Sequence, residues 1–415
     1  MKFRNFLELL LIFLVVLSGG SVLFVMYRNI GYIIIFLLSL ILLFNSDIKS
    51  STLKAIVLTS ISICAIFYST YIFAIAEQSV LKYLFILLMS IGAVFVVAYF
   101  KNNYKNQRVV NLLYVVLKLF LFHGLLSFVL SFIVEDYLVS FTSGHYEAKT
   151  LFHVFYYGHE INFNNLLEFK LYRNQGLFWE AGVFQVFLNI LFFLEAFIIK
   201  RSKLLLYLVS FVILTTYSTT GFIVLFIQLL VLFFQNSNNR VYLIPTVLVV
   251  MLPLYMLFKI NIEQKIYGES EMSFQIRLFD FIQPIGIALD NPLTGIGLDR
   301  DKFVEYRYSY FLPINSINKI QELSGIMMKQ QGTELGSTNS LMFLLAGAGI
   351  PTTVFFLYML FRQQIVRDNR KLFVFIIIIS IMSEPLLFRT FFFMFIVSGL
   401  MNTFNKITSH KQQLA

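Results

Sequence analysis

Long apolar segments recur from one end of the chain to the other, and two polar segments interrupt them. A helix that crosses a bilayer needs about 20 predominantly apolar residues. In hydrocarbon every backbone N–H and C=O needs a partner within the protein, and these runs lack the alternation of a membrane barrel. The pattern therefore predicts helices, about twelve by hydropathy. The predicted spans are residues 5–26, 30–44, 53–76, 80–100, 109–134, 180–199, 203–218, 220–235, 241–259, 339–361, 371–384 and 386–404.

The two polar segments, residues 135–179 and 260–338, divide the chain into three membrane bundles. The bundles comprise residues 1–134, 180–259 and 339–415. We therefore expect an all-α, polytopic integral membrane protein with two large external loops. Its chemistry should lie where these loops meet the ends of the helices.

Composition supports a membrane protein and excludes several kinds of site. The chain is 58% hydrophobic, and only 13% of its residues are charged, against about 25% in ordinary soluble domains. A single cysteine, Cys64, excludes an internal disulfide and a cysteine-based metal site. Nucleotide-binding loops and paired metal-ligand motifs do not occur, so we expect neither a metal nor a cofactor.

The distribution of charge predicts the orientation. The first polar segment carries three basic and five acidic side chains, and the second carries seven and ten. Basic residues are concentrated in the short connections on the other side, such as residues 200–203 and 362–371. Because cytoplasmic loops are rich in Lys and Arg, both termini are expected in the cytoplasm. The net charge of +10 then reflects orientation and contact with anionic lipid, with no role for nucleic acid.

Three polar motifs occur in a fixed order around these loops. The first runs from Arg173 to Gly182 and includes Trp179 and Glu180. The second is Arg277 followed by Pro-x-x-Gly-x-Gly at 292–297. The third is Ser337–Asn339, followed by Gly-Ile at 349–350. In order and spacing these motifs resemble the O-antigen polymerase and O-antigen ligase superfamily of bacterial envelope glycosyltransferases, over roughly residues 170–400.

The resemblance implies a GT-C-like architecture and glycosyl transfer at the outer face of the bacterial cytoplasmic (inner) membrane. The reaction it implies is polymerisation of undecaprenyl-diphosphate-linked repeat units into an O-antigen, capsule or exopolysaccharide. The implied partners are the lipid-linked oligosaccharide, membrane lipids and a chain-length-control protein. No metal or nucleotide is needed for this reaction.

Two other functions remain as alternatives. Ligases of the superfamily usually carry His-Asn at the third motif, where this chain has Thr338-Asn339, so the polymerase branch is favoured over a ligase. A lipid-linked oligosaccharide flippase typically has paired repeats and a charged central cavity. The sequence contains no repeat and places most of its polar residues in the two loops.

The chemistry of a departing diphosphate identifies candidate residues. Arginine offers a planar, permanently charged fork for phosphate, which favours Arg173 and Arg277, with Arg300 third. The acceptor hydroxyl needs a general base, for which Glu180 is the first candidate and Asp299 and Glu334 are alternatives. Each has a structural alternative, such as a lipid contact for an arginine or a favourable helix-dipole charge for the glutamate.

Five further residues are candidates for binding substrate. Gly295 and Gly297 permit a tight turn and close backbone approach. Trp179 is either an interfacial anchor or a stacking surface for a sugar. Thr338 and Asn339 either contact substrate or cap the helix that follows them.

Overall fold

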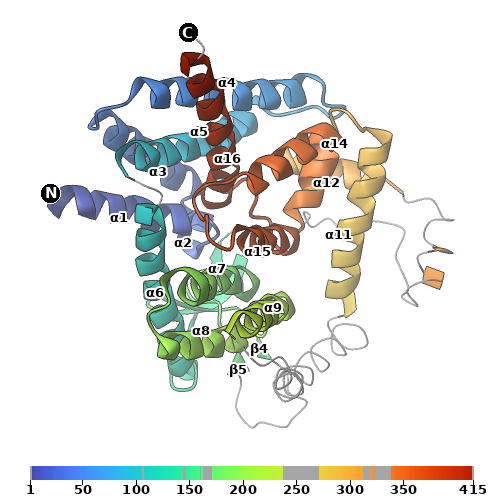
Figure 1. Ribbon diagram of the computed structural model, residues 1–415. Coiled ribbons are helices and arrows are strands. Elements are labelled where there is room, and N and C mark those ends of the chain that lie inside the picture. Colours follow the sequence, from blue (N-terminus) through green and yellow to red (C-terminus); the bar gives the residue numbers. More distant parts are fainter. Residues whose placement is uncertain are drawn as a thin grey trace. The chain divides into compact units, whose positions relative to one another are not determined.

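The computed structural model describes residues 2–104, 107–143, 146–158, 160–161, 171–236, 271–311, 318–319, 321–322 and 338–413. Figure 1 shows the chain as a ribbon that is built chiefly of helices. The predicted span 241–259 and the candidate base Glu334 lie outside the described residues.

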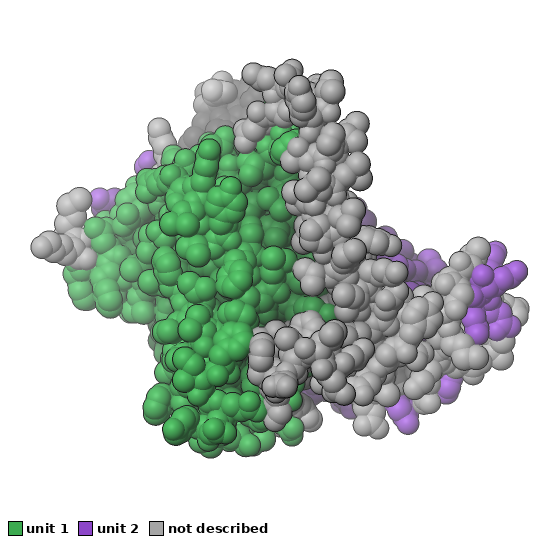
Figure 2. Space-filling view, turned by 90° about the horizontal axis from the view of Figure 1, so that it is seen from below, with its two compact units in different colours: residues 1–42, 103–261, 365–380 green, residues 43–102, 262–364, 381–415 purple. Residues whose placement is uncertain are grey.

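The chain forms two compact units, each assembled from discontinuous segments and coloured separately in Figure 2. Unit 1 comprises residues 1–42, 103–261 and 365–380, and unit 2 comprises residues 43–102, 262–364 and 381–415. The helices wholly or chiefly in unit 1 are α1 (Lys2–Leu17), α2 (Val22–Met26), α3 (Arg28–Phe44), α6 (Gln107–Leu130), α7 (Ala181–Phe193), the π-helical turn η2 (Leu194–Ile199), α8 (Lys203–Thr215), α9 (Thr219–Asn236) and α15 (Arg370–Ser383). The helices of unit 2 are α4 (Ser50–Ile72), α5 (Val80–Asn103), α11 (Glu271–Asp290), α12 (Arg300–Ser309), α14 (Ser340–Phe361) and α16 (Thr390–Gln413).

Five helical segments in the described part of the chain are long and apolar enough to cross a membrane: α4, α5, α6, α7 with η2, and α14. Four shorter apolar helices are α3, α8, α9 and the first part of α16. These helices support the expected all-α membrane fold. The number of twelve spans and the GT-C-like architecture stay predictions.

The first polar segment contains β-structure that the sequence pattern did not predict. A 3-10 turn, η1 (Glu135–Tyr137), leads into the strands β1 (Val139–Ser143), β2 (Tyr146–Leu151) and β3 (Phe155–Tyr157), which form an antiparallel sheet in that order. The short strands β4 (Glu160–Ile161) and β5 (Leu171–Tyr172) form a second pair. The Tyr157 hydroxyl donates to the Ser127 carbonyl of α6 at 3.0 Å, which fixes the sheet to the end of that helix.

The first predicted span, residues 5–26, is interrupted between α1 and α2. Gly20 has φ +129°, and a Cβ there would meet the ring of Trp179. The Trp179 amide donates to the Gly20 carbonyl at 3.1 Å, and the Val22 amide donates to the Leu177 carbonyl at 2.9 Å. The run is apolar throughout, so its composition did not predict this break. The backbone groups that the break leaves without helical partners are paired with the segment that carries the first motif.

Candidate functional site

Arg173 lies in a non-helical segment of unit 1 between β5 and α7. It is half-buried, and its Nε donates to the Thr216 carbonyl at 3.2 Å, in the turn between α8 and α9. The next residue, Asn174, is buried and donates to the Gly124 carbonyl at 2.9 Å and to Thr215 Oγ1 at 3.0 Å. These bonds attach the segment to α6 and α8, so the position of Arg173 is set by two helices.

Gln175 supports the same segment from the sheet. Its Nε2 donates to the Tyr146 hydroxyl of β2 at 2.6 Å, and burial raises the pKa of that hydroxyl. Gly176 follows with φ +56°, where its amide donates to Asn174 Oδ1 at 3.2 Å. A glycine is favoured here because an L side chain rarely adopts this backbone conformation. Asn174 and Gln175 were missed by sequence reasoning, although two adjacent amides beside an apolar span were a usable signal.

Trp179 and Glu180 end the first motif at the start of α7. The Trp179 ring packs on Gly20 as described above, so part of its surface is used by the fold. Glu180 is the N-cap residue of α7, and its carbonyl accepts from the amides of Val183 and Phe184. Its half-buried carboxylate makes no capping bond, and no hydrogen bond or ion pair joins it to the described residues.

Arg277 lies on α11 in unit 2. The side chain is half-buried and forms no ion pair with the part of the chain that the structure describes. Asp280 follows three residues later and Gln283 three residues after that, so all three lie near one face of the helix.

Asp280 and Arg307 form a fully buried ion pair that sequence reasoning missed. Each side chain is 1% exposed, and Arg307 Nη2 lies 2.7 Å from Asp280 Oδ1. Arg307 Nε donates to Gln283 Oε1 at 2.6 Å, and its guanidinium lies over the rings of Phe279 and Phe303. Its Nη1 is buried without a hydrogen-bond partner among the described residues. Nothing in the residue pattern distinguishes Arg307 from the exposed charges of the same polar loop.

The second carboxylate oxygen of Asp280 accepts hydrogen bonds from Thr338 of the third motif. The Thr338 amide and the Thr338 hydroxyl both donate to Asp280 Oδ2 at 2.8 Å. Asn339 Oδ1 caps α14 by accepting from the Met342 amide at 3.0 Å. The capping role considered for Asn339 is therefore present. The start of α14 is attached to α11 and α12 through one buried carboxylate.

The glycine-rich turn between α11 and α12 packs against an interruption in α14. Gly349 has the non-helical angles φ 79° and ψ 172°. Just before this break in the chain, the carbonyls of Ala346 and Gly347 accept hydrogen bonds from the amides of Ile296 and Gly297, at 2.9 and 2.8 Å.

Gly295 and Gly297 are needed for this close packing. Both have positive φ, and a Cβ at Gly295 would meet the backbone of Ala346 and Gly347. A Cβ at Gly297 would meet the side chain of Gln78. The contacts seen at these two glycines are with the protein itself, as expected for a close backbone approach.

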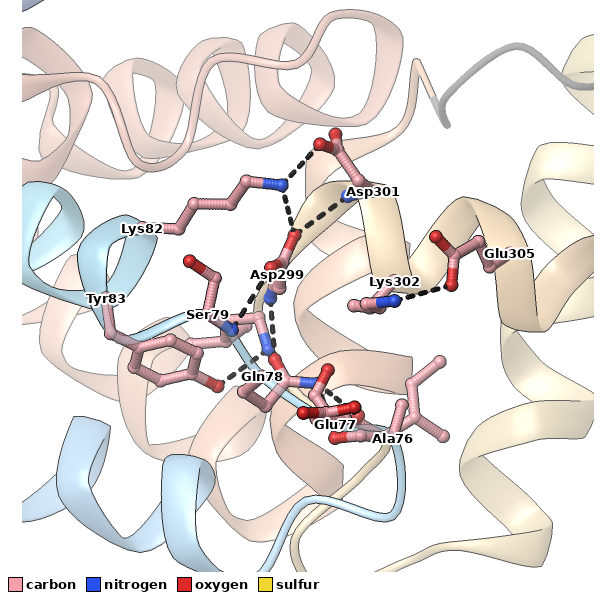
Figure 3. A network of polar contacts seen from close by, with 12 residues as sticks. Ala76, Glu77, Gln78, Ser79, Lys82, Tyr83, Asp299, Asp301, Lys302 and Glu305 are labelled. Atoms are coloured by element: carbon pink, nitrogen blue, oxygen red, sulfur yellow. Dashed lines mark hydrogen bonds and ion pairs between the residues drawn. The ribbon is translucent and has the colours of Figure 1, made fainter.

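Asp299 anchors the same turn to α5, as Figure 3 shows. Its carboxylate accepts from Lys82 Nζ at 2.8 Å and from the amides of Ser79 and Asp301. Lys82 also pairs with Asp301. Burial acts to raise the pKa of Asp299, but the bonds from Lys82 and the amides outweigh burial and hold this pKa below its ordinary value. These bonds make Asp299 a structural anchor and a weak candidate for a base.

Gln78 completes the anchor beside α5. Its Nε2 donates to the carbonyls of Ala76 and Ile296 at 2.7 and 3.1 Å, and its Oε1 accepts from the Asp299 amide at 2.9 Å (Figure 3). Arg300 begins α12 next to this network and is exposed.

The candidate residues thus form two groups, one in each unit. Unit 1 carries Arg173, Trp179 and Glu180 within one segment. Unit 2 carries Arg277, Gly295, Gly297, Arg300, Thr338 and Asn339. Among the residues that the structure describes, no three His, Cys, Asp or Glu side chains gather as a metal site would require.

The long apolar helices, together with polar segments that carry arginine and carboxylate groups at helix ends, define a multi-pass membrane protein. Residues 204–357 match the family model described as O-antigen ligase. The match runs from α8 into α14 and includes Arg277, the glycine-rich turn and Thr338-Asn339. The resemblance to the O-antigen polymerase and ligase superfamily is confirmed over this stretch, which supports a membrane enzyme of glycosyltransferase type. Searches of curated proteins and of solved structures found no match.

Proposed function

We propose that this protein polymerises undecaprenyl-diphosphate-linked oligosaccharide repeat units into a surface polysaccharide at the outer face of the bacterial cytoplasmic membrane. The observation that carries the proposal is the O-antigen ligase family match over residues 204–357, with Thr338 at the position where ligases usually carry histidine. Thr338 uses both its amide and its hydroxyl to bind Asp280. This position then serves the fold, which favours a polymerase over a ligase.

The two arginines supply the electrostatic part of the reaction. In the transfer step the bond between the anomeric carbon of the donor sugar and the diphosphate oxygen breaks, and the diphosphate leaves with the electron pair. Arg173 and Arg277 are assigned to the growing negative charge, because donors placed where charge develops stabilise a transition state. The Thr216 carbonyl orients Arg173, and the neighbouring Asp280 contacts fix the helix that carries Arg277.

Glu180 is assigned as the general base. As the acceptor hydroxyl oxygen bonds to the anomeric carbon, its proton passes to the Glu180 carboxylate. This side chain is half-buried and makes no capping bond, and a base must reach the hydroxyl directly or through one water. Asp299 is a weaker choice because Lys82 and two backbone amides already bind its carboxylate.

Glycan sizing after gene deletion tests the assignment against its alternatives. Loss of a polymerase leaves single repeat units on the carrier or on the final anchor. Accumulation of long lipid-linked chains would instead indicate a ligase, and repeat units trapped on the inner leaflet would indicate a flippase. Either of these two outcomes contradicts the proposal.

Complementation with variants then tests the arginines. Arg277→Ala should abolish elongation while the protein remains in the membrane, and Arg277→Lys should also be impaired because an ammonium cannot bind phosphate in a bidentate manner. Arg367→Ala serves as the control, since Arg367 is exposed and lies outside the candidate groups. Normal glycan lengths with Arg277→Ala would refute the role of Arg277.

A further inference from the structure

A cleft of about 760 Å³ opens between α7 with η2, α8 and α9 in unit 1. Its walls are mainly apolar and include Phe192, Leu206, Phe226, Leu230 and Phe233. Its volume falls in the range of about 300–1,000 Å³ that is typical of ligand pockets. The candidate residues for glycosyl transfer do not line it.

One end of the cleft is strongly basic. Lys200, Arg201 and Lys203 line it and are exposed, and none of them forms an ion pair with the described residues. The nearby Glu195 is 1% exposed, and its carboxylate accepts from the Tyr114 hydroxyl at 2.6 Å and from the amides of Arg201 and Ser202. Its charge is thus directed at the backbone that begins α8, and the three cationic side chains remain available to an anion.

The length of the cleft corresponds to one leaflet of a bilayer. On α9 the lining residues run from Gln235 to Phe226, and on α8 they run from Lys203 to Ser210. At 1.5 Å per residue these stretches extend about 10–13 Å along the helices. Half of the hydrocarbon core is about 15 Å thick. The basic end lies at the end of α7 with η2 that is opposite to Glu180, on the side that the charge pattern predicts to be cytoplasmic.

We infer that this cleft binds one anionic phospholipid of that leaflet. The phosphate of the headgroup contacts Lys200, Arg201 and Lys203, and the acyl chains lie along the apolar walls of α8 and α9. Charge complementarity selects the headgroup, because basic pockets between transmembrane helices on the cytoplasmic side favour anionic lipids. The cleft is separate from the proposed transferase site. The lipid-binding inference does not depend on which glycan the protein transfers.

Lipid titration of the purified full-length protein tests this inference. Fluorescent phosphatidylglycerol should bind saturably at one molecule per chain and more tightly than phosphatidylcholine. Removing both lysines with Lys200→Gln and Lys203→Gln should weaken phosphatidylglycerol binding about 30-fold, since each lysine near an anionic headgroup contributes about 1 kcal/mol. The matched control, Lys49→Gln with Lys54→Gln, removes two exposed lysines of unit 2 and should leave binding unchanged.

A second pair of variants tests the acyl chains without changing the charge. Ser210→Trp fills the deep end of the cleft and should weaken binding, whereas Ser210→Ala keeps the cleft open and should not. Equal binding of the two lipids, equal losses with the control lysines, or full binding by Ser210→Trp would overturn the inference. Displacement of the lipid by inorganic phosphate at equal concentration would assign the basic end to a free phosphate and would overturn it too.

Discussion

The buried pair between Asp280 and Arg307 offers the sharpest test of how unit 2 positions its candidate residues. Both side chains are 1% exposed, and the carboxylate also holds Thr338 through two bonds of 2.8 Å. Removing one partner of a buried pair costs about 3–5 kcal/mol, because an uncompensated charge remains inside. That cost is a large fraction of the roughly 5–15 kcal/mol that stabilises a typical domain. Asp280→Ala and Arg307→Ala should each lower thermal stability and protein level markedly.

The double replacement separates stability from positioning. Asp280→Leu with Arg307→Met removes both charges and fills the space with apolar groups, and such exchanges are often neutral or stabilising. Protein level and thermal stability should therefore recover. Elongation should stay impaired, because Thr338 loses its acceptor and the start of α14 is no longer fixed to the helix that carries Arg277.

The assay is fluorescence-detected thermal unfolding in detergent, combined with glycan sizing in complemented cells. Lys302 and Glu305 form an exposed ion pair on the same helix α12, at 2.9 Å, and provide the control. Their joint replacement by alanine should change neither readout. Normal glycan lengths in the apolar double variant would refute the positioning role, and single variants as stable as wild type would refute the argument from burial.

Two further predictions concern the glycine-rich turn. Gly295→Ala should destabilise the protein by about 1–3 kcal/mol, because the new methyl group meets the backbone of α14 at a position with φ +68°; thermal unfolding checks this, and Leu293→Ala at an exposed position of the same turn should have little effect. The pKa of Asp299 is depressed in the folded protein, so its stabilising contribution is present above the ordinary value of 3.8 and is lost as the pH falls below it. Asp299→Asn should therefore be less stable than wild type at pH 6, and the difference should shrink in unfolding scans taken toward pH 3; a constant difference would contradict this reasoning.

Hydropathy predicted most of the described helices, because length and apolar composition determine whether a segment can lie in a membrane. Hydropathy did not predict where a helix is interrupted, because an interruption depends on backbone geometry. The runs containing Gly20 and Gly349 are as apolar as their neighbours, yet both are interrupted there and packed against another segment. The sheet of the first polar segment was missed because its strands are short and were treated only as a loop.

The sequence motifs suggest candidate residues, but they do not reveal the contacts that hold those residues in place. The sequence identified Arg173, Glu180 and Arg277 as candidates because a diphosphate requires cations and a hydroxyl requires a base. It could not show that Asp280 and Arg307 are buried, since nothing in their sequence distinguishes them from solvated charges. Such pairing depends on segments that are far apart in the chain.

The central proposal is that Arg173 and Arg277 act on the departing diphosphate at the outer face of the membrane, and labelling of substituted cysteines tests their side of the membrane most directly. Cys64 is the only native cysteine, so Cys64→Ser gives a background free of cysteine, into which Arg173→Cys and Arg277→Cys are introduced. A thiol reagent that cannot cross the membrane should label each of these two positions in intact spheroplasts. Labelling of both positions is the predicted result. Thiols that the reagent reaches only after the membrane is opened would contradict the account.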